Sequence, residues 1–163
     1  MPFSLIPRLR LGRVTALTPA FLRARGVRLL LLDLDNTLAP YSGPGPTPEL
    51  FAWKEALLAG GVTPFIVSNT KTERAKRFAA LWGVDYVDGA GKPRRRGIET
   101  ALRRCGARPE EAALAGDQIF TDVLGANRAG VLSVVTHPLE LKNPFYILRY
   151  AAELPFRAAG KSL

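Results

Sequence analysis

Four leucines followed by two aspartates constrain this chain most: the run Leu29-Leu-Leu-Leu-Asp-Leu-Asp35. A fully apolar run predicts a strand buried on both faces, as in a parallel sheet. Side chains two apart on a strand share a face, so Asp33 and Asp35 are expected to project together from its C-terminal tip. Two carboxylates held close repel each other unless a cation or a shared proton intervenes. The run therefore predicts a buried strand with an acidic tip that suits a hard divalent ion.

A simple turn or a calcium loop would also place acidic residues here. Asp and Asn favour turns, and Asn36 suits a turn that merely follows the strand. A calcium loop of the EF-hand type fits less well, because its sixth position would be Leu38, where such a loop needs Gly. On these residues alone, the turn stays open as an alternative.

Strand and helix patterns alternate along the rest of the chain. Strands are predicted at about 27–34, 64–68, 84–87, 111–116 and 131–136. Helices are predicted at about 18–25, 48–59, 72–82, 94–105, 122–129 and 144–156. This alternation predicts an α/β fold: a doubly wound, mostly parallel, five-stranded sheet with helices on both faces.

Length and composition indicate a single folded domain. A chain of 163 residues with 47% hydrophobic residues can bury a sizeable core and is not of the disordered class. We expect one domain over 1–163, with a core at about 27–136, a basic segment at 1–26 and a helical tail at 140–163. Cys105 is the single cysteine, which excludes an internal disulfide and is compatible with a reducing compartment. It is expected to pack in the core.

The expected location is the cytoplasm. Residues 1–14 lack the apolar centre of a secretory signal. No stretch approaches the roughly 20 apolar residues that span a bilayer. An Arg-rich, acid-free start also suits an organellar transit segment, which remains an alternative.

The charge is strongly basic and unevenly placed. The net charge is +9, and no acid precedes Asp33. Such a surface attracts phosphates, whether on nucleic acid, on anionic lipid or on a small substrate, although a solvated basic exterior accounts for any single arginine as well. The basic residues concerned are Arg8, Arg10, Arg13, Arg23, Arg25 and Arg28, then Lys92, Arg94, Arg95 and Arg96.

Polar residues follow the predicted strands at the points where they end. A parallel sheet brings the carboxyl ends of its strands to one edge, so residues far apart in sequence can converge there. Carboxylates with one lysine and one hydroxyl are what metal-assisted phosphoryl transfer requires. The converging residues are Asp33, Asp35, Ser68, Asn69, Lys92, Asp117 and Asp122.

The three strand-end carboxylates receive distinct roles. Asp33, nearest the sheet, is the expected nucleophile, because a carboxylate can form an aspartyl-phosphate and divide hydrolysis into two easier steps. Asp35 is placed to protonate the leaving group and then deprotonate water. Mg²⁺ is the expected cofactor, held by Asp33 and Asp117 with a backbone carbonyl at Asp35.

The remaining residues are expected to serve the phosphate. Ser68, Asn69 and Lys92 would neutralise charge on the transferred group. Asp122 would hold Lys92 or touch the metal through water. Each has a plain structural alternative: Ser68 and Asp122 can cap helices, and Lys92 can be solvated charge.

On these motifs the sequence resembles the haloacid dehalogenase (HAD) superfamily of phosphatases. The resemblance implies the HAD-like Rossmannoid fold, Mg²⁺ and the roles given above. Within the superfamily, the residues of these motifs are most similar to those of a small bacterial branch, the YqeG-type proteins. These proteins resemble the mitochondrial phosphatidylglycerophosphate phosphatase. The matching stretches are Asp33-Leu-Asp-Asn-Thr37, Ser68 in Ile-Val-Ser-Asn-Thr, Lys92 before Pro93, and Gly116-Asp-Gln-Ile-Phe-Thr-Asp122.

Spacing bears on the substrate. HAD enzymes of small metabolites usually carry a cap domain, and the gaps from Asp35 to Ser68 and from Ser68 to Lys92 leave no room for one. An open site suits a phosphate on something large, so the resemblance and spacing favour phosphatidylglycerophosphate on an anionic membrane surface. Phosphoproteins, nucleotides and sugar phosphates are the enzyme alternatives. A basic nucleic-acid or ribosome-binding module with an idle site is the non-enzyme alternative, though no aromatic residues interleave with its basic runs.

The tail supplies a further expectation about membranes. Residues 145–157 have the pattern of an amphipathic helix that could lie in the headgroup plane at the inner face of the membrane, with Arg149 and Arg157 toward phosphates. The alternative is that this helix packs against the domain. His137, the single histidine, is expected at the surface.

Overall fold

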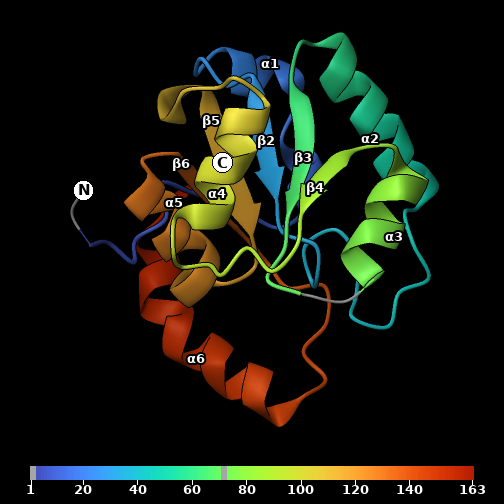
Figure 1. Ribbon diagram of the computed structural model, residues 1–163. Coiled ribbons are helices and arrows are strands. Elements are labelled where there is room, and N and C mark those ends of the chain that lie inside the picture. The colour runs from blue at the N-terminus through green and yellow to red at the C-terminus, as the bar shows by residue number, and fades with distance from the viewer. Residues whose placement is uncertain (1–2, 71–72) are drawn as a thin grey trace.

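The computed structural model describes residues 3–70 and 73–163. A seven-stranded sheet in the order β4-β3-β2-β5-β6-β1-β7 forms its centre, and each of its neighbouring pairs is parallel (Figure 1). The strands are β1 (Leu9–Leu11), β2 (Leu29–Leu32), β3 (Thr63–Val67), β4 (Asp85–Val87), β5 (Ala112–Gly116), β6 (Leu132–Thr136) and β7 (Lys161–Ser162).

The helices lie close to their predicted positions. The start predicted at Thr72 falls outside the described residues. A 3₁₀ turn at Val14–Ala16, another at Pro109–Glu111 and a π-helical turn at Ile119–Val123 complete the regular structure. The α-helices are α1 (Pro19–Arg23), α2 (Pro48–Ala59), α3 (Glu73–Trp82), α4 (Arg96–Arg104), α5 (Leu124–Ala129) and α6 (Pro144–Ala158).

The predicted parallel α/β fold is confirmed, but the prediction of five strands is wrong. β1 and β7 extend the sheet beyond β6 and come from the two segments expected to lie outside the core. β1 has three residues, in which Leu9 and Leu11 are buried around exposed Arg10, and β7 has two. Elements this short give no detectable alternation, so their positions depend on pairing that the sequence does not reveal.

Helices cover both faces of the sheet, because β2 is apolar on both sides. Leu30 and Leu32 pack with the helices α1, α2 and α3. Leu29 and Leu31 pack with α4 and α5 on the other face. All four leucines are almost fully buried, and each contributes about 1.5–3 kcal/mol to folding. This burial fixes the strand whose tip carries the acidic pair.

The predicted start of α2 is confirmed. Thr47 caps the helix, with its hydroxyl accepting a hydrogen bond of 3.3 Å from the amide of Leu50, and Pro48 occupies the first turn. In the described residues, the connection from Asp35 to Ser68 holds α2 and β3, and that from Ser68 to Lys92 holds α3 and β4. Within residues 35–70 and 73–92, neither connection holds a separate cap domain.

The chain reverses its direction of progress across the sheet between β2 and β5. From β2 it proceeds to β3 and β4 on one side, and then returns to β5 and β6 on the other. Such a switch point opens a crevice at the carboxyl ends of the two strands, which is where α/β sheets bind ligands. Asp33 and Asp117 directly follow β2 and β5, on the two sides of this crevice.

Among the described residues, no helix combines the length and hydropathy needed to cross a bilayer. α6, at fifteen residues, is the longest helix in the described part of the chain. It lies below the sheet in Figure 1, at the end toward which the strands point. Its contacts belong to the site described next.

Candidate active site

Lys92 joins two carboxylates at the switch point. Its ammonium nitrogen lies 2.7 Å from Asp33 Oδ1 and 2.7 Å from Asp122 Oδ1, and all three side chains are almost fully buried. The backbone amide of Asp33 is anchored to β5 by a hydrogen bond of 2.9 Å to the carbonyl of Ala115. Residues predicted from three separate segments therefore meet in one ion-paired cluster.

Asp117 completes the acidic cluster. A carboxylate oxygen of Asp33, one of Asp117 and one of Asp122 lie within 4.8 Å of one another. Asp117 is fully buried, and neither of its carboxylate oxygens has a hydrogen-bond partner among the described residues. Buried acceptors without partners are costly, and a hard cation is the usual compensation for oxygen ligands of this kind. The donor set therefore fits a divalent metal ion.

The electrostatics of the cluster agree with that assignment. Burial and the neighbouring carboxylates Asp122 and Asp35 raise the pKa of Asp33 to about 7, although Lys92 acts in the opposite direction. Burial, Asp122 and Asp33 likewise raise the pKa of Asp117 well above its ordinary value. Burial lowers the pKa of Lys92, but Asp122 and Asp33 more than offset that effect, so it remains charged. The cluster holds more negative charge than its lysine can neutralise.

Asp35 is held differently from Asp33. One carboxylate oxygen accepts a hydrogen bond of 2.8 Å from the Thr70 hydroxyl, and the other accepts one of 2.8 Å from Nε of Arg74. Arg74 also donates to the carbonyls of Pro40 and Gly43, which fixes the loop after Asp35. These two hydrogen bonds fix the orientation of the Asp35 side chain, which lies outside the cluster formed by Asp33, Asp117 and Asp122.

Ser68 and Asn69 lie at the end of β3, as predicted, and both side chains make hydrogen bonds there. Ser68 is buried, and its hydroxyl accepts a hydrogen bond of 3.2 Å from the Thr70 amide. The Asn69 side chain accepts from the Lys92 amide at 2.7 Å and donates to the Lys92 carbonyl at 2.9 Å. Asn69 therefore positions the backbone of Lys92.

A close approach explains the glycine before Asp117. A Cβ on Gly116 would lie 2.3 Å from Cγ and Oδ2 of Asp122, so only glycine lets that carboxylate approach. Asp122 Oδ2 also accepts a hydrogen bond of 3.1 Å from the Gln118 amide, which closes the π-helical turn. The Gly-Asp-x₄-Asp spacing is therefore a packing requirement as well as a source of ligands.

α6 reaches the site through its polar side, which the sequence did not predict. Arg149 lies 3.6 Å from Asp117 Oδ2. Arg157 is buried and donates to the backbone carbonyls of Thr136 and Asp117, and it pairs with Glu153 at 3.0 Å. The expectation that Arg149 and Arg157 face lipid phosphates is wrong: both arginines point into the protein, because the buried carboxylates there require cations. The helix contacts the domain through this polar side.

Aromatic contacts fix the same helix at its start. Tyr146 stacks on Tyr41 with ring centroids 5.1 Å apart and an angle of 3° between planes. Burial, Tyr146 and the carboxylates Asp117 and Asp35 raise the pKa of Tyr41. His137 is exposed, as predicted, and its Nδ1 lies 3.0 Å from the Tyr150 hydroxyl. Tyr41, Arg74 and Arg149 are site neighbours that lie outside the strand-end motifs.

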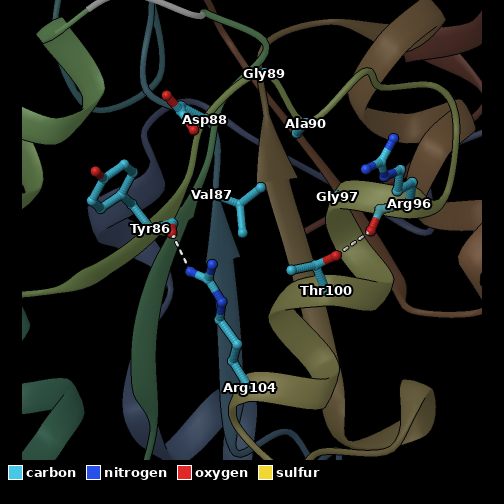
Figure 2. Close-up of a pocket in the computed structure, with 9 residues that line it drawn as sticks. All are labelled: Tyr86, Val87, Asp88, Gly89, Ala90, Arg96, Gly97, Thr100 and Arg104. Carbon is cyan, nitrogen blue, oxygen red and sulfur yellow. Dashed lines mark hydrogen bonds between the residues drawn. The ribbon is translucent and has the colours of Figure 1, made fainter.

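A separate cavity of about 430 Å³ lies between β4 and α4 (Figure 2). Arg104 donates to the Tyr86 carbonyl at 2.9 Å, and Thr100 donates to the Arg96 carbonyl at 2.9 Å, so two of the polar side chains on its wall are already engaged. None of the acidic cluster residues lines it. The candidate chemistry belongs to the crevice between β2 and β5.

Comparisons with known proteins agree with this geometry. The family model described as haloacid dehalogenase-like hydrolase matches residues 46–130. The chain is 35% identical over 129 residues to the Bacillus subtilis (strain 168) protein named as probable phosphatase YqeG, covering 79% of this chain and 75% of that protein. It is 30% identical over 143 residues to phosphatidylglycerophosphate phosphatase 1, chloroplastic/mitochondrial, of Arabidopsis thaliana, covering 82% of this chain but 41% of that protein.

Solved structures share the fold. The cobalt-bound deoxy-D-mannose-octulosonate 8-phosphate phosphatase (YrbI) of Haemophilus influenzae gives a TM-score of 0.57 at 13% identity, covering 85% of this chain and 77% of that one. The 3-deoxy-D-manno-octulosonate 8-phosphate phosphatase of Yersinia pestis gives a TM-score of 0.53 at 15% identity, covering 84% and 85%. At these identities the likeness concerns the fold alone.

Proposed function

The chain belongs to the haloacid dehalogenase-like hydrolase family and is a phosphatase, and from this premise we propose that it cleaves phosphate monoesters through an aspartyl-phosphate on Asp33. The observation that carries the proposal is the convergence of Asp33, Lys92, Asp117 and Asp122 at the switch point. A carboxylate fixed by the sheet and paired with a buried ammonium is suited to attack phosphorus.

The proposed first step forms one bond and breaks one. A carboxylate oxygen of Asp33 attacks phosphorus, and the bond from phosphorus to the ester oxygen breaks. The leaving alkoxide takes a proton from Asp35, which Thr70 and Arg74 hold in a fixed orientation. Lys92 offsets the negative charge that gathers on the phosphoryl oxygens.

The second step restores the enzyme. Water attacks phosphorus of the aspartyl-phosphate and gives a proton to Asp35. The bond between phosphorus and the Asp33 oxygen breaks, which releases inorganic phosphate and the free carboxylate. Asp35 thus returns to its protonated form for the next substrate.

Mg²⁺ is the proposed cofactor, with Asp33 and Asp117 as its carboxylate ligands and a backbone carbonyl at Asp35. When bound, it would reduce repulsion between the phosphate and the acidic cluster. Asp122, which the cluster also includes, is proposed mainly as the partner of Lys92. The carboxylate oxygens of Asp117 support this assignment, because they are buried and accept no hydrogen bond from the described residues.

The proposed substrate is phosphatidylglycerophosphate presented by an anionic membrane. The name of the Arabidopsis relative supports this choice, as does a site without a cap domain in the described residues. Phosphoproteins, nucleotides and sugar phosphates remain the competing substrates. The relatives that match are named as phosphatases, so we set aside the alternative of a binding module with an idle site.

A substrate panel tests the proposal. Phosphate release is measured with Mg²⁺ from phosphatidylglycerophosphate in mixed micelles and from soluble phosphoprotein, nucleotide and sugar phosphates. We expect the lipid to react fastest and Asp33→Asn to remove turnover without unfolding the chain. Asp85→Asn, at an exposed aspartate at the start of β4, is the matched control. Full activity of Asp33→Asn would contradict the mechanism, and faster release from a soluble phosphate would contradict the substrate.

A further inference from the structure

α6 is amphipathic in the reverse sense to an ordinary surface helix. A helix on a protein in water normally buries its apolar stripe and exposes its charges. In α6 the outward side is apolar, with Phe145 67% exposed, Leu148 71% exposed and Leu154 48% exposed. Glu153 and Arg157, by contrast, are buried. The helix therefore presents to solvent the side that is expected to avoid it.

The inward side is fastened by specific contacts. Residues spaced three, four and seven apart along α6 lie on one side of a helix. Rolling the helix to bury its apolar side would break an aromatic stack, a phenol–imidazole hydrogen bond and several ion pairs. The inward residues are Tyr146 on Tyr41, Arg149 on Asp117, Tyr150 on His137, Glu153 on the Phe120 amide, and Arg157 on Thr136.

We call the outward side of this helix the α6 outer face. Within α6, all of whose residues are described, no charged side chain belongs to this face, and its residues follow helical spacing. Leu5 packs against the same small cluster as Phe156, so the exposed Phe3 and Ile6 lie in a segment that approaches the C-terminal part of the helix. The α6 outer face consists of Phe145, Ile147, Leu148, Ala151, Ala152 and Leu154.

We infer that the α6 outer face docks on the surface of an anionic lipid bilayer. Interfacial helices bury an apolar side at the boundary between headgroups and acyl chains, and basic residues nearby strengthen binding to anionic lipid. Lys161 is exposed just after α6, and Arg8 is exposed in the segment that adjoins it. Lys142, exposed just before α6, pairs with Glu140 at 2.6 Å. The apolar face thus has basic residues beside its C-terminal end.

Charge favours a bilayer over a second copy of this chain. The net charge of +9 opposes self-association and attracts an anionic surface. The α6 outer face also lacks the hydrogen-bonding side chains that a protein interface usually places among its apolar contacts. The acyl-chain boundary of a lipid surface does not require such hydrogen-bonding side chains.

Docking would bring the acidic crevice to the membrane. The helix that carries the outer face also contacts Asp117 through Arg149, on its inward side. Only the thickness of this helix therefore separates the proposed bilayer contact from the site. This consequence rests on the proposed function, in which the phosphate belongs to a lipid. The docking itself does not require it.

The test is co-sedimentation of the full chain with vesicles that contain no phosphomonoester. We expect binding to vesicles of phosphatidylcholine with about 30% phosphatidylglycerol, an anionic content that recruits basic interfacial helices, and weak binding to phosphatidylcholine alone. Leu148→Glu should lower the partition coefficient about tenfold or more. Leu58→Glu, at an exposed leucine of α2, is the matched control and should leave it unchanged.

Hydrolysis of a soluble aryl phosphate separates docking from folding. Leu148→Glu should retain that activity, because Leu148 points away from the site. Equal partition of the Leu148→Glu variant and the unaltered chain would overturn the inference, as would a dimer in solution that Leu148→Glu dissociates. Since the vesicles carry no substrate, vesicle binding and lipid-phosphate turnover can fail independently.

Discussion

Lys92 and Asp33 form an ion pair of 2.7 Å across 59 residues of sequence, and both side chains are buried. Asp122 accepts the same ammonium from its other side, also at 2.7 Å. The lysine therefore compensates two buried carboxylates at once. Its removal has consequences for folding as well as for chemistry.

Replacing Lys92 by Met should destabilise the protein strongly. Removing one partner of a buried ion pair leaves uncompensated charge and typically costs about 3–5 kcal/mol. We expect a loss of that size in the free energy of unfolding, measured by urea denaturation at neutral pH with a chelator present. Adding Asp122→Asn to Lys92→Met should recover part of the loss, because one of the stranded carboxylates is then neutral. A loss below about 1 kcal/mol would show that water reaches the cluster.

Replacing Arg74 by Ala should lower kcat about tenfold to a hundredfold, because Asp35 loses the contact that fixes one of its oxygens. KM should change less, since Arg74 contacts neither Lys92 nor Ser68. Arg77→Ala, three residues further along α3 and exposed, is the control. Steady-state kinetics with circular dichroism checks the prediction, and an unchanged kcat in Arg74→Ala would exclude a positioning role.

Metal binding should release protons below neutral pH. In the metal-free protein, the pKa of Asp33 is raised to about 7, so this carboxyl holds a proton at pH 6 and has largely lost it at pH 8. A cation that takes the carboxylate must displace that proton, so affinity should rise as pH increases to about 7. Titration calorimetry with Mg²⁺ in two buffers of different ionisation enthalpy measures the proton release at each pH. Equal release at pH 6 and pH 8 would count against Asp33 as a ligand.

A distant surface carboxylate should govern part of the acid sensitivity. Hydrogen bonds from Arg28 and Arg108 lower the pKa of Glu111 from 4.5 to about 2. Because the folded-state pKa lies below that of the unfolded chain, this stabilisation is present above pH 4.5 and is lost as pH falls toward 2. Glu111→Gln should therefore lower the urea midpoint at pH 7 and cause a smaller shift near pH 3.

The neighbouring glutamate provides the control for that comparison. Glu110 is exposed and pairs with Arg108 at 3.4 Å. Glu110→Gln should have little effect at either pH, as is usual for exposed pairs. If the two variants behave alike, the Arg28 contact does not stabilise the fold.

The residues at the strand ends were predictable from sequence because a parallel sheet leaves little choice. Asp33 and Asp117 directly follow apolar strands that are buried on both faces. Residues in that position must lie at the carboxyl edge of the sheet. The spacing of Gly116 and Asp122 followed from the same motif. The pairing of Lys92 with Asp122 was predictable too, and their 2.7 Å contact agrees.

Contacts from helix surfaces were not predictable. Arg74 on α3 and Arg149 on α6 resemble solvated charges in sequence, and only the folded arrangement places them against Asp35 and Asp117. The hydrogen bonds that the Asn69 side chain makes with the amide and the carbonyl of Lys92 were likewise not predictable from its position after β3. Such pairings depend on the relative placement of elements distant in sequence, which no local pattern encodes.

The position of α6 in the chain has a consequence for biosynthesis. Every other contributor to the crevice precedes this helix, and Arg149 and Arg157 reach Asp117 from it. Because folding during translation proceeds from the N-terminus, the β2–β5 pair and its lysine can assemble while the ribosome is still adding α6. A nascent or truncated chain lacking α6 would hold an Asp117 with neither arginine nearby, so the buried carboxylate would gain these two cationic neighbours only after α6 is added.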